Sequence, residues 1–506
     1  MDSTERISAF EKRLKRQVIG KPHRFLAVVP LGFEQTLVDE LEFIGQERVN
    51  DQGSSSFDVK IAGDGKVEFT AKLVDAWKIV AFSRIANRIL MHIADFKAEN
   101  FRELEKKAAE IPWELYLSDE KRVNIHVTCK HSRLYHSDAV AERLQKVIEG
   151  GSLPLAAAPA GSSATPSAGA PRNAPKSEEI VLPQNLYVTL IDDRCTLWLD
   201  LAGEELYKRG HERFVNDAPL KETIAAGMLQ EAFNAATQAL KHQPRITLID
   251  PMAGSGTFSL EAAYMANGLI PGKCRNFALK HQPAFKPATW NHIVNSVNAK
   301  PNPSLRRNDD TELSLRRIDD SILSLLRNDN PILSLRRNEV TAAIPGTIQK
   351  IVTSDISERA VEIIQHNVEC CPLANIAPSA APTISPQLRD FFSYTAKEIA
   401  ELCGESAPVI VLNPPYGKRL DFDAPKLYTQ IGKKFAELAR ELAALGKQLT
   451  VAILAPKDDS RPGSKYTCTA NLLHECPALD PQQNSDAKNI VTSHGGLSLN
   501  AIIARI

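Results

Sequence analysis

Four residues that follow an apolar run at 409–412 combine hydrogen-bond acceptors with an aromatic ring: Asn413, Pro414, Pro415 and Tyr416. The run is typical of a buried strand, and the two prolines remove amide donors, which leaves the Asn413 side-chain oxygen and the Pro414 carbonyl oxygen as acceptors. This pair can hold both hydrogens of an exocyclic amino group and aim the nitrogen lone pair at a methyl donor. Tyr416 offers a flat face to a base swung out of its stack. We therefore predict that these four residues are catalytic, although the tetrapeptide alone could form a simple turn.

A second segment with chemical potential, DPMAGSGTF, spans residues 250–258 and follows another apolar run. Its two glycines allow the backbone to approach a ligand closely, and a helix is expected to begin just after them. A phosphate-binding loop requires a lysine where Thr257 stands, and a dinucleotide fingerprint requires a third glycine where Ser259 stands. The acid at the strand end instead suits a cationic ligand without phosphate, such as S-adenosylmethionine; a glycine turn that binds nothing is the alternative. The cofactor contacts predicted here are Asp250, Ala253, Gly254, Ser255, Gly256 and Thr257.

Two further acids stand at the ends of predicted strands. Asp355 ends the run KIVTSD and can accept both ribose hydroxyls of a nucleoside, although such an acid can also cap the following helix. Asp390, in LRDFF, is a candidate acceptor for an adenine amino group, with a surface loop acid as the alternative. Because parallel strands end at one edge of a sheet, we expect both acids to lie beside the glycine segment.

The composition sets the broad class of the protein. A chain of 506 residues is too long for one ordinary domain, and 61 Lys+Arg against 61 Asp+Glu leaves no net charge, so any basic surface must be local. The 8 cysteines include no Cys-x-x-Cys pair, which indicates a reducing compartment and predicts no metal site. No apolar run reaches membrane-spanning length, so we expect a cytoplasmic protein without membrane contact. The oligomeric state cannot be read from these features.

The order of apolar and polar runs divides the chain into parts. Residues 1–24 are a basic-leaning arm, either a short helix or frayed, and residues 25–205 mix strands and helices in an α+β pattern. Residues 150–177 are a low-complexity insertion within that region. Residues 206–506 alternate strand and helix, which predicts a doubly wound parallel sheet. A decapeptide repeat at 301–340 interrupts them; we interpret it as a tolerated loop, with an arginine-rich RNA-contacting arm as the alternative.

Four segments together resemble a known family: residues 112–144, 199–229, 248–263 and 412–420. They are similar to class I S-adenosylmethionine-dependent amino-methyltransferases, and in particular to the bacterial THUMP-domain 23S ribosomal RNA guanine-N2 methyltransferases. The resemblance implies a Rossmann-like α/β catalytic domain, preceded by an α+β RNA-binding region with a ferredoxin-like part and a THUMP domain. It also implies S-adenosylmethionine as cofactor and further contacts with it from Pro219, Lys221, Glu222 and Asn413.

The RNA-binding half carries one loop with suitable chemistry. The stretch KHSRLYHSD brings Lys130, Arg133, Tyr135 and His136 to one turn after a strand, which would supply phosphate contacts and a stacking ring; an ordinary solvated loop is the alternative. We therefore predict methylation of a guanine N2 amino group in RNA, with 23S ribosomal RNA as the partner. The alternatives are guanine-N2 methylation of transfer RNA, the related chemistry at adenine N6 or a glutamine amide, and a non-catalytic RNA-binding or ribosome assembly factor. Because the chain ends just after the last predicted strand, a single reaction is expected.

Overall fold

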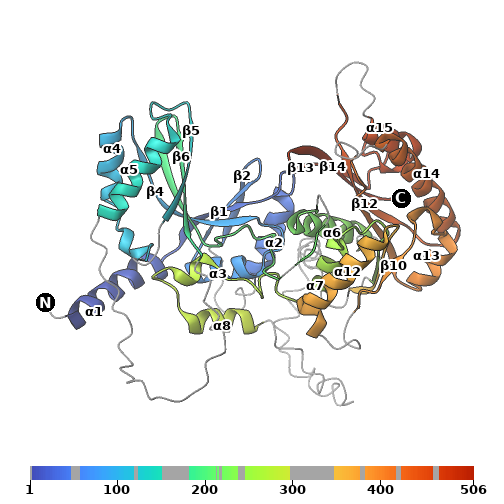
Figure 1. Ribbon diagram of the computed structural model, residues 1–506, viewed down its shortest axis with the longest axis horizontal. Helices are drawn as coiled ribbons and strands as arrows, with labels where there is room; N and C mark the ends of the chain where they lie inside the picture. Colours follow the sequence, from blue (N-terminus) through green and yellow to red (C-terminus); the bar gives the residue numbers. More distant parts are fainter. Residues whose placement is uncertain are drawn as a thin grey trace, which may run out of the picture.

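The structure is a computed structural model with two seven-stranded sheets, one on each side of the molecule as drawn in Figure 1. The decapeptide repeat at 301–340 lies outside the described residues, as does all but the first residue of the insertion at 150–177. What the sequence predicts for these two segments therefore stays a prediction. The described residues are 3–46, 57–118, 123–150, 182–211, 213–215, 219–237, 245–296, 347–375, 382–416, 423–459 and 467–506.

The first sheet begins with a ferredoxin-like unit. Its strand order is β2-β3-β1-β4, antiparallel throughout, and the chain order is strand, helix, two strands, helix, strand. Phe33, Leu37 and Leu41 are fully buried and Ile44 is partly buried, so this side of the α2 segment packs into the core. The elements are β1 (His23–Val28), α2 (Glu34–Gln46), β2 (Asp58–Gly63), β3 (Lys66–Ala71), α3 (Leu73–Phe82) and β4 (Arg88–Lys97).

The same sheet continues beyond β4 into a second unit. β7 pairs antiparallel with β4 and with β6, while β5 and β6 are parallel, so the α+β prediction for this region is confirmed. β6 and β7 form a hairpin that turns at Asp192 and Asp193, both with positive φ. Assignment of this unit to a THUMP domain stays a prediction. Its elements are α4 (Phe101–Ala109), β5 (Val123–Lys130), α5 (Ser137–Gly150), β6 (Gln184–Ile191) and β7 (Arg194–Asp200).

The N-terminal arm is helical and packed. α1 (Ser3–Leu14) runs into a short π-helical turn, Lys15–Ile19, and the first strand begins at His23, two residues before the start expected from the sequence. Leu14 and Val18 are buried in the core. The described part of the arm is therefore the short helix of the two predicted alternatives, because its apolar side chains reach the core.

The second sheet has the order β10-β9-β8-β11-β12-β14-β13. The strands β10, β9, β8, β11 and β12 are parallel, but β14 is antiparallel to both β12 and β13. The predicted parallel sheet is present from β10 to β12, and at this edge β13 and β14 form a hairpin whose turn holds Gly495 and Gly496 at positive φ. The strands are β8 (Ile246–Asp250), β9 (Ile348–Asp355), β10 (Pro386–Leu388), β11 (Ala407–Leu412), β12 (Thr450–Pro456), β13 (Ala487–His494) and β14 (Leu497–Arg505).

Helices cover both faces of this sheet, as the doubly wound prediction requires. Along β11, Val409 and Val411 join one buried cluster with α6 and α7, while Ile410 and Leu412 join a second cluster with α13, α14 and α15. Burial on both sides explains why the strand reads as a continuous apolar run. The helices described between residues 206 and 506 are α6 (Glu222–Thr237), α7 (Thr257–Ala266), α8 (Pro287–Ser296), α12 (Glu358–Cys370), α13 (Ala396–Cys403), α14 (Ala424–Ala444) and α15 (Cys468–Glu475). Within the described ranges, no helix combines the length and apolar character needed to cross a membrane.

The two sheets are joined by a buried helix contact. α2 of the ferredoxin-like unit packs on α6 of the second unit, and a Cβ added at Gly227 would lie only 2.7 Å from the Phe33 ring. One buried hydrophobic cluster includes residues of both units. The position of the second sheet and its helices is thus set by close packing against the ferredoxin-like unit.

Candidate active site

A cavity of about 1170 Å³ opens at the carboxyl ends of the parallel strands, where ligands bind in open α/β sheets. Small-molecule sites usually measure about 300–1,000 Å³, so the cavity has room for a cofactor and a second group. It is lined by predicted site residues from separate parts of the chain: Pro219, Lys221, Glu222, Ala253, Gly254, Ser255, Thr257, Asp355, Asp390, Asn413, Pro414, Pro415 and Tyr416.

Two predicted cofactor contacts, Asp250 and Gly256, lie behind the cavity wall. Asp250 is fully buried, and its Oδ2 accepts hydrogen bonds from the Ser259 backbone amide (3.2 Å) and hydroxyl (2.8 Å). Its Oδ1 has no partner among the described residues, and burial raises the Asp250 pKa to about 7. Gly256 has φ of 80°, and an added Cβ would lie 3.2 Å from Ile364. Both residues therefore have a supporting role. Asp250 organises the start of α7, and Gly256 lets α12 pack closely against the glycine loop.

Gly254 and Asp355 shape the wall that faces the cavity. Gly254 has φ of 56° and open space where a side chain would stand, so its backbone is exposed to a ligand. Its amide donates to Asp355 Oδ2 at 2.9 Å, and the Ser357 amide donates to Asp355 Oδ1 at 2.9 Å. Ser357 caps α12, so Asp355 is not the helix cap that the alternative interpretation requires. Two amides orient its carboxylate, and the remaining lone pairs are available for ribose hydroxyls.

Asp390 lies at the next strand end. Its Oδ1 accepts a hydrogen bond from the Phe392 amide at 3.0 Å and so caps a 3-10 turn, Phe391–Ser393. Ile356, which directly follows Asp355, and Phe392, two residues after Asp390, also line the cavity, and Ile356 is 71% exposed. The sequence analysis missed these apolar residues, although an apolar residue within two positions of each strand-end acid was a usable signal for a base-binding surface.

The tetrapeptide after β11 lies between the glycine loop and the far strands of the sheet. β11 pairs with β8 on one side and with β12 on the other, and Asn413 follows its last residue. Pro414 is buried, while Asn413 and Tyr416 are half-buried and face the cavity. The Tyr416 hydroxyl donates a hydrogen bond to Asn413 Oδ1. The predicted acceptor is therefore present at the cavity and is engaged by the predicted stacking residue.

The segment that precedes α6 closes another side of the cavity. The Lys221 ammonium lies 4.6 Å from the Tyr207 ring centre and 3.7 Å from Glu205 Oε1. His494 Nε2 hydrogen-bonds to the Pro219 carbonyl oxygen at 2.9 Å, which joins this segment to the β13–β14 turn. His494, Gly495 and Leu497 also line the cavity. No local pattern could have revealed them, because the contact spans 275 residues of sequence.

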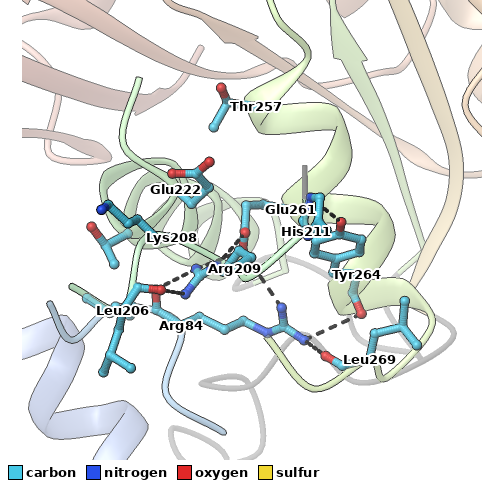
Figure 2. A network of polar contacts seen from close by, with 12 residues as sticks. Arg84, Leu206, Lys208, Arg209, His211, Glu222, Thr257, Glu261, Tyr264 and Leu269 are labelled. Carbon is cyan, nitrogen blue, oxygen red and sulfur yellow. Dashed lines mark hydrogen bonds and ion pairs between the residues drawn. The ribbon is translucent and has the colours of Figure 1, made fainter. Parts of the chain in front are cut away.

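A buried ion pair fastens the same segment to both halves of the molecule, as Figure 2 shows. Arg209 Nε donates to Glu261 Oε1 at 2.8 Å, and its NH2 donates to Glu261 Oε2 at 3.1 Å. Arg209 NH2 also donates to the carbonyl oxygen of Arg84, which belongs to the ferredoxin-like unit, at 2.9 Å. Arg84 in turn reaches the carbonyl oxygens of Tyr264 and Leu269 at the end of α7. The helix that starts at the glycine loop is thus held at its other end by the ferredoxin-like unit.

The predicted RNA-binding residues form one exposed loop, away from the cavity lining. Tyr135 is 69% exposed, and its ring centre lies 4.1 Å from that of His136. Arg133 is paired with Glu99, and its amide donates to Asp193 Oδ1 at 2.7 Å. The positive charge of Arg133 is therefore partly compensated.

The pairing register extends this loop into a row across the sheet. Lys130 is opposite Ile191, Ile191 is opposite Arg194, and Arg194 is opposite Lys97, so these four side chains share one face. All four are exposed. Arg194 pairs with Asp95, whereas no ion-pair partner of Lys130 occurs in the described ranges. The sequence analysis missed Lys97 and Arg194, because only the strand register reveals this alignment.

Two segments of the chain match known protein domains. Residues 209–454 match the RMKL-like methyltransferase domain, and residues 24–90 match the RlmL ferredoxin-like domain. "Ribosomal RNA large subunit methyltransferase K/L" of Shewanella sp. (strain MR-7) is 26% identical over 423 residues, which cover 81% of this chain and 46% of that protein. The chain therefore spans about half the length of this relative.

Two solved structures share the fold. A possible methylase from Clostridium difficile 630 has a TM-score of 0.61 at 19% identity, covering 96% of this chain and 98% of the other. SMU.472, solved in complex with SAH, has a TM-score of 0.60 at 20% identity, covering 96% of this chain and 98% of the other. Together with the two domain matches, these likenesses agree with the strand order and the ferredoxin-like unit described above. The chain therefore carries a segment that matches the RMKL-like methyltransferase domain, residues 209–454, and ahead of it a segment that matches the RlmL ferredoxin-like domain, residues 24–90.

Proposed function

We propose that this protein transfers a methyl group from S-adenosylmethionine to the exocyclic N2 amino group of a guanine in RNA, with 23S ribosomal RNA as substrate. The observation that carries the proposal is the position of Asn413 to Tyr416 at the end of β11, directly beside the glycine loop that follows β8 and within the same cavity. In this arrangement an amino group held by the tetrapeptide faces a ligand held by the loop.

The residues at the cavity fit the cofactor. Gly254 leaves its backbone open to a ligand, and the oriented carboxylate of Asp355 can accept ribose hydroxyls. Asp390, Ile356 and Phe392 are available for a flat base with an amino group. Bound S-adenosylmethionine would supply an electrophilic methyl group on a sulfonium centre. Because strands β9 and β10 lie on one side of β8 and β11 lies on the other, the nucleoside part and the target base belong at opposite ends of the cavity.

The chemistry of this chain's own residues is mainly positioning and electrostatics. A guanine N2 nitrogen is a poor nucleophile because its lone pair is delocalised into the ring. Asn413 Oδ1 and the Pro414 carbonyl oxygen would accept hydrogen bonds from its two N–H groups, draw electron density back onto the nitrogen and fix the direction of its lone pair. Tyr416 releases Asn413 when the base enters and provides the stacking face.

The choice of RNA as substrate is supported by the first sheet and by the relatives. The loop with Tyr135 and the row from Lys97 to Lys130 combine a stacking ring with cations on one exposed surface, as backbone-led RNA docking requires. The Shewanella relative is named a ribosomal RNA large subunit methyltransferase. A ribosomal substrate would also agree with the predicted cytoplasmic location.

Methyl transfer from labelled S-adenosylmethionine, followed by nucleoside analysis, tests the proposal. The substrates are naked 23S RNA, assembled large subunits and bulk transfer RNA, each with the wild-type protein and with Asn413→Ala. We expect label in N2-methylguanosine from 23S RNA with the wild-type protein alone. Label found only in transfer RNA would show that transfer RNA, and not 23S RNA, is the substrate. Label in N6-methyladenosine would overturn the assignment of guanine as the target base. Binding of RNA without methyl transfer would favour a non-catalytic assembly factor.

A further inference from the structure

Arg213 lies in the cavity wall in contact with three predicted cofactor residues. One NH donates to Glu222 Oε1, and the other donates to the Ser255 hydroxyl at 3.0 Å and to the Thr257 hydroxyl. The side chains of Arg213 and Glu222 are only 10% and 14% exposed. Arg213 Nε has no hydrogen-bond partner among the described residues, so the guanidinium has an unused donor. The sequence analysis assigned no role to Arg213.

The backbone next to Arg213 is fixed by a buried side chain of α12. Asn367 Oδ1 accepts from the Phe214 amide at 2.8 Å, and Asn367 Nδ2 donates to the Phe214 carbonyl oxygen at 2.9 Å. The same Nδ2 donates to the carbonyl oxygen of Ser255 in the glycine loop at 3.1 Å. Upstream, Arg209 is anchored to Glu261 and to the ferredoxin-like unit (Figure 2). Arg213 therefore stands on a segment that is tied at both ends and lies against the glycine loop.

The charges of this cluster indicate the kind of ligand it suits. A guanidinium with two hydroxyls beside it suits a carboxylate, because such donors form short, charge-assisted hydrogen bonds with it. The adjacent Glu222 carboxylate suits an ammonium and would repel a phosphate group. Burial raises the Glu222 pKa even though Arg213 opposes the shift, so a bound ammonium would further stabilise the ionised carboxylate. The cluster is complementary to a zwitterion with adjacent positive and negative groups.

We propose that Arg213 and Glu222 form the subsite for the zwitterionic amino-acid end of S-adenosylmethionine, with Arg213 binding the carboxylate and Glu222 the ammonium. The inference rests on the cofactor named in the proposed function. The inference adds a cofactor-binding arginine to that function. Because the ferredoxin-like unit anchors the segment that carries Arg213, both halves of the molecule contribute to this subsite.

Calorimetry with two ligands tests the subsite without methyl transfer. S-adenosylhomocysteine carries the amino-acid end, whereas 5′-methylthioadenosine keeps the nucleoside and sulfur and lacks that end. Hydrogen bonds to charged groups usually contribute enough to predict that Arg213→Gln weakens S-adenosylhomocysteine binding roughly 10- to 100-fold. The affinity for 5′-methylthioadenosine should stay within about twofold, because this ligand does not reach Arg213.

Lys208→Gln is the matched control, since Lys208 also lines the cavity and carries one positive charge, but pairs with Glu204. It should leave the affinity for both ligands near the wild-type value. Equal loss of both ligands in Arg213→Gln would make Arg213 a purely structural residue and overturn the proposal, as would no loss of either. If Arg213→Gln does not fold, Arg213→Lys replaces it, because lysine keeps the positive charge without the forked guanidinium. Arg213→Lys should show a smaller loss of affinity, confined to S-adenosylhomocysteine. A loss of affinity for both ligands would again overturn the proposal. Failure of the wild-type protein to bind either ligand would instead remove the cofactor of the proposed function.

Discussion

The Tyr416 hydroxyl donates its hydrogen bond to Asn413 Oδ1, the oxygen proposed to grip the target amine. Two residues proposed for one reaction are therefore hydrogen-bonded to each other. The Tyr416 hydroxyl therefore competes with guanine for this acceptor, and the hydroxyl and the ring of Tyr416 should have separable effects.

Tyr416→Phe and Tyr416→Ala separate them. The phenylalanine variant keeps the stacking face and frees Asn413, so methyl transfer should be retained or raised. The alanine variant should lose transfer roughly 10- to 100-fold, since base stacking on an aromatic ring contributes about 1–3 kcal/mol. Single-turnover methylation of RNA measures both. Equal loss in the two variants would assign the effect to the hydroxyl and contradict stacking.

Asp250 should make stability depend on pH. Its pKa is raised from 3.8 to about 7 by burial. Between these values the unfolded chain releases the Asp250 proton while the folded protein keeps it, so the free energy of unfolding should fall as pH rises through this window. Asp250→Asn removes the titrating proton and should make the fall shallower. Denaturant unfolding at several pH values measures the slope, and an unchanged slope would contradict the shift.

The two glycines of the loop should fail in different ways. Both have positive φ, so an alanine at either site adds strain of about 1–2 kcal/mol. At Gly256 the new methyl group also meets Ile364, whereas at Gly254 it projects into open space at the cavity. Gly256→Ala should therefore lower the free energy of unfolding more, and Gly254→Ala should lower the affinity for S-adenosylhomocysteine more. The opposite ranking in paired denaturation and calorimetry measurements would contradict the assignment of the loop.

Lys130 should contribute to RNA binding through charge. Replacing it by glutamine should weaken binding for all RNA sequences and reduce the slope of log affinity against log salt by about 0.7–0.9 for one lost phosphate contact. Arg143→Gln is the control, because Arg143 is an exposed cation of α5 that pairs with Glu105. A salt slope that changes as much in the control as in Lys130→Gln would show that the row across the sheet is not a specific contact surface.

Much of the catalytic half could be predicted, because local patterns determine it. The apolar run before Asn413 is buried on both faces of a sheet, and the residues after such a strand must emerge at its carboxyl edge, as Asp355 and Asp390 also do. Parallel strands bring these ends together wherever they lie in the sequence. The glycine loop could be placed for the same reason, since a helix follows it directly.

The remaining features depend on contacts that local patterns do not encode. The His494 contact with Pro219 crosses 275 residues, and nothing near either residue indicates it. Asp250 has the residue type of a ligand contact, yet burial places it behind the loop. Leu14 and Val18 gave the arm apolar contacts that its charged composition obscured.

The most direct measurement is methyl transfer to 23S RNA by Asn413→Ala, with the affinity for S-adenosylhomocysteine measured on the same preparation. Loss of a preorganised polar contact in a transition state typically costs about 10²–10³ in rate, so N2-methylguanosine formation should fall by roughly that factor. The ligand affinity shows whether the variant still builds the cavity. Undiminished formation of N2-methylguanosine by a variant that binds S-adenosylhomocysteine normally would contradict the proposed grip on the amine.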